Sequence, residues 1–140
     1  MLAAQSFSVP PMPLPQLLGS EKGACADVMI SGIQLDSRQV RPGDLFLALP
    51  GEKFDGRQFI AQAVANGAAA VVAEAPVADA ARAIAVPLVE LPALQARAGF
   101  LAARFYRHPS HAMQVVGITG TNGKTTTSRI IAQLTRALGK

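Results

Sequence analysis

The sequence has no tryptophan, one cysteine and few charged residues, and each shortage excludes a class of protein. Cys25 alone cannot form an internal disulfide, and no Cys-x-x-Cys or Cys/His spacing indicates a metal site. The N-terminus lacks the basic and apolar regions of a signal peptide, and no apolar run approaches the roughly 20 residues of a membrane-spanning helix. We therefore expect a cytoplasmic protein in a reducing compartment, without membrane insertion.

The charge pattern argues against a nucleic-acid-binding protein. The 13 Lys and Arg residues outnumber the 9 Asp and Glu residues, but the basic residues are scattered. An arm that binds nucleic acid usually concentrates them. We therefore predict no nucleic-acid partner. The excess of basic over acidic residues fits solvated surface charge or, as a second interpretation, the binding of an anionic small molecule.

The first 91 residues predict a small parallel α/β sheet. Half of the sequence is hydrophobic but only 5% is aromatic, so the core must consist of Ala, Val, Leu and Ile. A roughly alternating segment and three short apolar runs predict strands, and Arg41–Asp44 is a turn signal. Helical spacing follows Asp55-Gly56-Arg57 and ends at Asn66-Gly67. The expected strands are 28–35, 45–49, 68–73 and 87–91, with helices over 59–65 and 79–84.

We place a second domain at residues 92–140. A helix over 94–105, a strand over 115–118 and a helix over 124–138 are predicted there. One strand and its helix cannot bury their own apolar faces, so we expect an incomplete P-loop, Rossmann-like domain. Four side chains would then lack native partners and promote self-association: Leu101, Phe105, Ile131 and Leu134.

The strongest motif is the glycine-rich segment from Gly120 to Thr126, between a predicted strand and an amphipathic helix. Gly120 and Gly123 permit positive φ and leave room beside the backbone, so that amide groups and a helix N-terminus can converge on phosphate oxygens. Lys124 supplies a charge for the β- and γ-phosphates, and Thr125 is placed to ligate Mg²⁺ bound to them. The segment is a shorter variant of the common eight-residue phosphate loop, whose first glycine would fall on Ile118.

A second group of polar residues permits two readings. Ser37 could donate a hydrogen bond to a phosphate or ribose, and Arg38 could pair with an anion. Alternatively, Asp36 and Asp55 are turn or cap residues, while Arg38 and Arg57 are surface charges. Spacing alone favours the second reading.

From about Gly32 to its end the sequence resembles the Mur ligase family, which builds the stem peptide of peptidoglycan. The resemblance rests on these segments: Asp36-Ser37-Arg38, Pro42 to Phe46, Asp55-Gly56-Arg57, Phe105-Tyr106, His108-Pro109-Ser110 and Gly117 to Thr127.

The resemblance implies two binding sites. The N-terminal domain would bind the uridine diphosphate part of a nucleotide-sugar through Leu35, Ser37, Glu52, Lys53 and Phe54. ATP would be held by the loop residues Gly120, Thr121, Asn122, Gly123, Lys124, Thr125 and Thr126, with Lys124 the catalytic residue and Mg²⁺ at Thr125.

The implied reaction is ATP-dependent amide formation. A diamino acid, diaminopimelate or lysine, would be joined to UDP-N-acetylmuramoyl-L-alanyl-D-glutamate through an acyl phosphate. Thr121-Asn122 and the threonine run favour this branch over the alternative, the branch that adds D-Ala-D-Ala. The full-length enzyme would be a monomer, and residues 1–140 alone would be inactive. A further alternative is a nucleotide-sugar-binding module whose P-loop part binds nothing.

Overall fold

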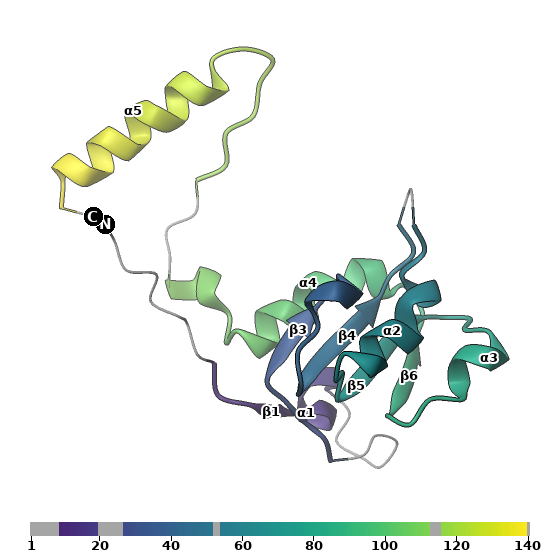
Figure 1. Cartoon of the computed structure of the whole chain (residues 1–140). Helices are drawn as coiled ribbons and strands as arrows, with labels where there is room; N and C mark the ends of the chain where they lie inside the picture. The colour runs from purple at the N-terminus through teal and green to yellow at the C-terminus, as the bar shows by residue number, and fades with distance from the viewer. Residues whose placement is uncertain (1–8, 20–26, 52–53, 113–115, 140) are drawn as a thin grey trace. The chain divides into compact units, whose positions relative to one another are not determined.

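The computed structural model describes residues 9–19, 27–51, 54–112 and 116–139. The chain divides into two compact units, Met1–His108 and Pro109–Lys140, which are described separately below (Figure 1). Within the described residues, no helix is long and apolar enough to cross a membrane.

Unit 1 contains the predicted parallel sheet. Its strands are β3 (Gly32–Gln34), β4 (Asp44–Ala48), β5 (Ala70–Glu74) and β6 (Leu88–Leu91), and they pair in that order. Each neighbouring pair is parallel; Leu45, for example, lies opposite Ile33 on one side and Ala70 on the other. The α/β fold class expected from the sequence is therefore confirmed.

The two central strands are buried on both faces, and the alternation of their side chains builds two cores. Leu45 and Leu47 of β4 pack on one face with α1 (Leu14–Leu18) and α4 (Leu94–Phe105). Phe46 and Ala48 pack on the other face with α2 (Ile60–Ala65). Figure 1 shows α2 and α4 on opposite sides of the sheet. Because strand side chains alternate, a wholly apolar run such as Leu45–Ala48 supplies both layers.

The segment predicted as one strand over 28–35 forms two. β2 (Met29–Ile30) pairs antiparallel with β1 (Met12–Pro13), whereas β3 begins at Gly32 and joins the main sheet. Between them the Ser31 amide donates to the Gly43 carbonyl at 2.9 Å. The backbone changes its hydrogen-bonding partner at this residue. One segment of alternating apolar and polar residues therefore contributes a strand to each of two sheets.

Helix α4 belongs to unit 1, although the sequence analysis assigned it to the domain beginning at residue 92. Leu94, Leu101 and Phe105 are buried against the sheet, and Arg104 Nη1 donates to the Leu17 carbonyl at 2.8 Å. The chain divides into its compact units between residues 108 and 109, not between 91 and 92. Leu101 and Phe105 therefore have partners in this chain, contrary to the expectation that they lack them.

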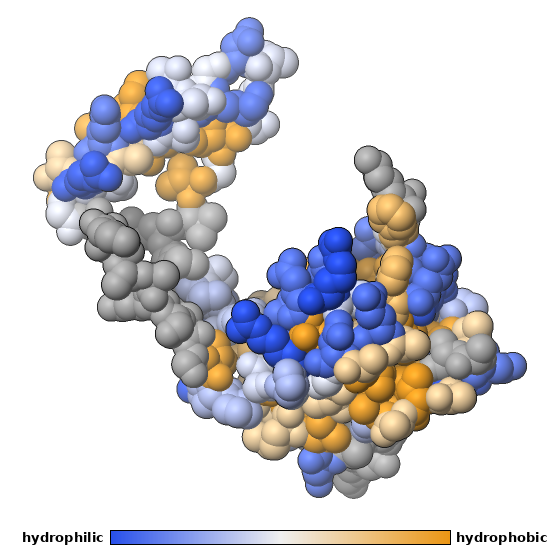
Figure 2. All heavy atoms as spheres, viewed as in Figure 1, coloured by the Kyte–Doolittle hydropathy of each residue, from blue (hydrophilic) through white to orange (hydrophobic). Residues whose placement is uncertain are grey.

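Unit 2 consists of a 3₁₀ helix, η3 (Pro109–Ala112), a loop and helix α5 (Lys124–Ala137). The helix was predicted, but the strand expected over 115–118 is not formed in its described part, 116–118. No other extended segment is described in unit 2, and a strand needs a partner to satisfy its backbone groups. Ile130 and Leu134 of α5 and its C-cap, Leu138, are exposed. Figure 2 shows hydrophobic surface on this unit, and self-association through it remains a prediction.

Candidate nucleotide-binding sites

A pocket of about 690 Å³ lies at the carboxyl ends of β3 and β4 in unit 1. Parallel sheets commonly bind ligands at this edge, because loops diverge there. The wall comes from the turn after β3, the loop after β4, α2 and the start of α4. It is lined by Leu35, Asp36, Ser37, Arg38, Phe46, Leu49, Pro50, Gly51, Phe54, Gly56, Phe59, Gln62 and Gln95.

Three of the five residues expected to bind a nucleotide-sugar line this pocket. Leu35 and Phe54 are 61% and 73% exposed, so both offer apolar surface to a ligand. Ser37 is buried in the pocket wall. Glu52 and Lys53 lie outside the described residues.

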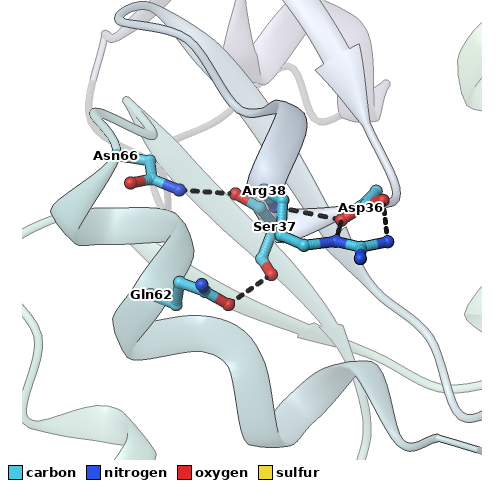
Figure 3. Close-up of polar contacts among 5 residues, drawn as sticks. All are labelled: Asp36, Ser37, Arg38, Gln62 and Asn66. Carbon is cyan, nitrogen blue, oxygen red and sulfur yellow. Dashed lines mark hydrogen bonds and ion pairs between the residues drawn. The ribbon is translucent and has the colours of Figure 1, made fainter.

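Helix α2 holds the turn that carries Ser37 (Figure 3). The Ser37 hydroxyl donates to Gln62 Oε1 at 2.8 Å, and Asn66 Nδ2 donates to the Ser37 carbonyl at 2.8 Å. The hydroxyl proton is therefore directed at Gln62, and the oxygen keeps lone pairs that can accept a hydrogen bond from a ligand.

Asp36 caps the 3₁₀ helix η1 (Ser37–Gln39), as the second reading of the sequence expected. Its carboxylate accepts from the Arg38 amide at 3.0 Å, from Nε at 2.9 Å and from Nη2 at 2.7 Å. These bonds, with Arg38's side chain the largest contributor, lower the pKa of Asp36 from 3.8 to about 2. Arg38 is 78% exposed at the pocket rim, and its third nitrogen, Nη1, makes none of these bonds.

Asp55 caps the next 3₁₀ helix, η2 (Gly56–Phe59), in the same way. Arg57 donates to its carboxylate from the amide and from Nε, each at 3.0 Å, and from Nη2 at 2.7 Å. Hydrogen bonding by the Arg57 side chain is the main cause that lowers the pKa of Asp55. Here Nη1 is also engaged, because it donates to the Pro76 carbonyl at 2.9 Å.

The pocket also includes Phe59, Gln62 and Gln95, which were not predicted as site residues. Phe59 was read as part of an apolar helix face, but it is 36% exposed and lines the pocket. Gln62 and Gln95 belong to helices distant in the sequence from Ser37, so no local motif could identify them. Exposed glutamine at the start of a helix is too common to be a signal without the fold.

The predicted phosphate loop is exposed throughout, from Gly120 to Thr126, and leads into α5. Gly123 is the N-cap, with φ 77°, and Gly120 has φ 141°. The first helical bond is from the Thr127 amide to the Gly123 carbonyl, so the amides of residues 124–126 have no partner inside the helix. The Lys124 ammonium donates to the Gly120 carbonyl and, at 3.3 Å, to that of Thr121.

Two comparisons of sequence place the chain. A family model described as "Mur ligase family, catalytic domain" matches residues 29–106, more than half of the chain. The chain belongs to the Mur ligase family. Its match to the model lies wholly within unit 1.

Sequence relatives extend the likeness across the phosphate loop. The UDP-N-acetylmuramoyl-L-alanyl-D-glutamate–2,6-diaminopimelate ligase of Ectopseudomonas mendocina (strain ymp) is 49% identical over 130 residues, which are 93% of this chain and 26% of the relative. The enzyme of the same name from Coxiella burnetii is 47% identical over 127 residues, 90% of this chain and 26% of the relative. The chain thus spans about a quarter of the length of the curated Mur ligases it matches.

Solved structures of two ligases share the fold. A UDP-N-acetylmuramoyl-L-alanyl-D-glutamate–2,6-diaminopimelate ligase superposes with a TM-score of 0.68 at 30% identity, covering 93% of this chain and 26% of that one. The Acinetobacter baumannii enzyme that is named a D-alanyl-D-alanyl ligase gives 0.64 at 32% identity, covering 87% and 27%. These scores are too similar for the fold to separate the two branches of Mur ligases.

Proposed function

We propose that this chain supplies the nucleotide-sugar pocket and the ATP phosphate loop of a ligase that adds a diamino acid to UDP-N-acetylmuramoyl-L-alanyl-D-glutamate. The observation that carries the proposal is that one stretch of about half-identical sequence includes both the pocket and the loop. The cytoplasm, where nucleotide-sugars and ATP are available, is the proposed location.

The loop fits a triphosphate. No heavy atom lies within 4 Å of the position that a Cβ at Gly123 would take, so the space beside the N-cap is open. The unpaired amides of residues 124–126 and the helix dipole favour an anion there. Lys124 already lies over the loop and can exchange its carbonyl partners for phosphate oxygens.

Mg²⁺ would depend on the phosphates. Among the described residues, no group of three His, Cys, Asp or Glu side chains could hold a metal ion. The hydroxyl of Thr125, in the first turn of α5, is the ligand we propose from this chain, with phosphate oxygens supplying others. The ion would offset the negative charge of the phosphates and the substrate carboxylate.

The pocket in unit 1 fits the nucleotide end of a sugar nucleotide. Leu35 and Phe54 offer apolar surface for a flat base, while Ser37, Gln62 and Gln95 offer neutral polar groups. The charges of Asp36 and Arg38 neutralise each other, and Arg38 Nη1 is left to donate to a phosphate. In this scheme unit 1 holds and orients the substrate. ATP supplies the phosphoryl group that converts a carboxylate into an acyl phosphate, and phosphate leaves when an amine attacks the acyl carbon.

Ligases that add D-Ala-D-Ala are the second candidate, because their solved structures share the fold. The sequence relatives favour the diamino-acid branch, since those at 45–49% identity carry the diaminopimelate name. A nucleotide-sugar-binding module without a working phosphate loop is the third candidate.

Phosphate release by the complete gene product tests the choice. With ATP and UDP-N-acetylmuramoyl-L-alanyl-D-glutamate present, we expect diaminopimelate or lysine to stimulate release. Stimulation only by D-Ala-D-Ala, with the diamino-acid-extended sugar nucleotide as acceptor, would assign the other branch. We expect residues 1–140 alone to release no phosphate. Turnover by residues 1–140 would contradict the proposal that this chain supplies two binding sites but not a complete ligase.

A further inference from the structure

The loop that follows β4 forms much of the pocket wall. Pro50, Gly51 and Phe54 line the pocket from this loop, and Phe54 is 73% exposed. Figure 1 shows the segment on either side of residues 52–53 projecting beyond the carboxyl end of β4. If Phe54 is to keep one position beside a ligand, other contacts must fix the two ends of this loop.

Backbone bonds close the base of the loop. Pro50 and Asp55 form an isolated antiparallel bridge, and the Gly51 amide donates to the Phe54 carbonyl at 3.0 Å. The Gly56 amide donates to the Leu49 carbonyl at 2.8 Å. All of these bonds lie within the loop or join it to the end of its own strand.

Arg57 joins the loop to a different strand. Its guanidinium binds the Asp55 carboxylate through Nε and Nη2 and reaches the Pro76 carbonyl through Nη1. Pro76 follows β5, the neighbour of β4 in the sheet. The planar head of arginine binds the carboxylate through two nitrogens and the carbonyl through a third, a spread of donors that the compact ammonium of lysine does not have.

Neither Asp55 nor Arg57 lines the nucleotide-sugar pocket. Both line a separate hollow of about 720 Å³, together with residues of α2 and of the segment before and after α3 (Asp79–Arg82). Arg57 therefore acts on a ligand only indirectly, through residues that do line the pocket.

We propose that Arg57 is a positioning residue for nucleotide-sugar binding: by clamping Asp55 to the segment after β5, it fixes the loop that presents Phe54 to the pocket. The inference rests on the proposed function for the identity of the ligand. The clamp itself rests only on the contacts above.

The test combines calorimetry and amide hydrogen exchange on the 140-residue chain, with UDP-N-acetylmuramoyl-L-alanyl-D-glutamate as the probe. Arg57→Ala should raise the Kd of this probe about tenfold and speed exchange at the Gly51 and Gly56 amides. The Val71 amide, which donates to the Pro87 carbonyl, should lose less protection than these two amides. Arg57→Lys should restore only part of the affinity.

Arg82→Ala is the matched control. Arg82 also pairs with a carboxylate, Glu90, at 2.7 Å, but it lines neither hollow. It should leave the Kd and the Gly51 and Gly56 amides unchanged. Asp55→Asn is a second variant for the case in which Arg57→Ala lowers the stability of the whole unit. It retains a side-chain oxygen for the cap and should also raise the Kd, by a smaller factor.

Three results would overturn the inference. The Gly51 and Gly56 amides could keep their protection in Arg57→Ala; the Kd could stay unchanged while those amides are exposed; or Arg82→Ala could have the same effects. A wild-type chain that binds no nucleotide-sugar would instead refute the proposed function and the ligand named here, and the exchange data would still show whether the clamp exists.

Discussion

Two segments of unit 1 have the same Asp-x-Arg spacing and the same local geometry, but they differ in what the middle and last residues reach. In Asp36-Ser37-Arg38 the serine side chain reaches Gln62 of α2, and the arginine is 78% exposed. In Asp55-Gly56-Arg57 the middle residue has no side chain, and the arginine, 30% exposed, extends to the Pro76 carbonyl. The shared cap motif therefore defines only the local turn. The residues packed around each turn determine which residue of the motif bonds to the rest of unit 1: Ser37 in the first segment and Arg57 in the second.

Exchanging the middle residues should produce the largest effect. A Cβ at Gly56 would lie 2.7 Å from the Leu49 carbonyl oxygen and 2.9 Å from its amide nitrogen, so Gly56→Ser must displace backbone. We expect a loss of about 1–3 kcal/mol in the free energy of unfolding, together with weaker nucleotide-sugar binding. Denaturant unfolding measures the first and calorimetry the second.

Gly99→Ser is the control, because a Cβ at Gly99 in α4 would have no atom within 4 Å apart from its chain neighbours and the backbone of its own helix. It should leave stability unchanged or raise it slightly. Equal losses in the two variants would show that the close approach at Gly56 is not what requires glycine.

Removing the serine side chain from the first segment should have the next largest effect. Ser37→Ala deletes the bond to Gln62, and the expected loss is about 1 kcal/mol. Gln62→Ala should cost a similar amount, and the double variant less than the sum, because both changes remove the same bond. Strict additivity in denaturant unfolding would mean that the bond contributes nothing.

The two arginines should differ in their effect on stability. Arg57→Ala removes the link between the loop after β4 and the segment after β5, so we expect a lower thermal unfolding midpoint. Arg38→Ala removes only a local, exposed pair and should lower the midpoint less. Calorimetric scans of both variants check this, and a larger drop for Arg38→Ala would reverse the comparison.

The smallest expected effect is the pH dependence of the first pair. The pKa of Asp36 is lowered from 3.8 to about 2 when the chain folds, so its ionised form stabilises the native state above the higher value. That contribution should shrink as the pH falls below about 4 and vanish below about 2. The stability difference between wild type and Asp36→Asn, followed by unfolding at decreasing pH, should be constant near neutrality and decline over this range. A difference that persists undiminished below pH 2 would exclude the carboxylate as its cause.

The sequence predicted the strands and helices of unit 1 well, because apolar runs and capping residues are local signals. The turn at Arg41–Asp44 closes with the expected bond from the Asp44 amide to the Arg41 carbonyl, and Gly43 has φ 93°. The helix over Leu94–Phe105 was also found, but its spacing cannot tell which sheet its apolar face will meet. The sequence therefore placed a domain boundary at residue 92, whereas the compact units divide between residues 108 and 109.

The candidate site was predicted only in part. Leu35, Ser37 and Phe54 line the pocket, but their assignment to a nucleotide-sugar came from the family resemblance and remains a prediction. Gln62 could not be predicted, because its contact with Ser37 joins residues 25 positions apart through the packing of α2 on the sheet. The strand predicted over 115–118 is not formed at the described residues 116–118, and it shows the same limit, because an apolar segment forms a strand only where a partner exists.

We propose that this chain binds two different ligands in two units, and calorimetry of the wild-type chain and of Lys124→Ala measures both affinities. The wild-type chain should bind UDP-N-acetylmuramoyl-L-alanyl-D-glutamate and Mg²⁺-ATP each with one site. Lys124→Ala should lose most of its ATP affinity while its Kd for the nucleotide-sugar stays the same. ATP affinity that survives the substitution, or a joint loss of both ligands, would contradict the account.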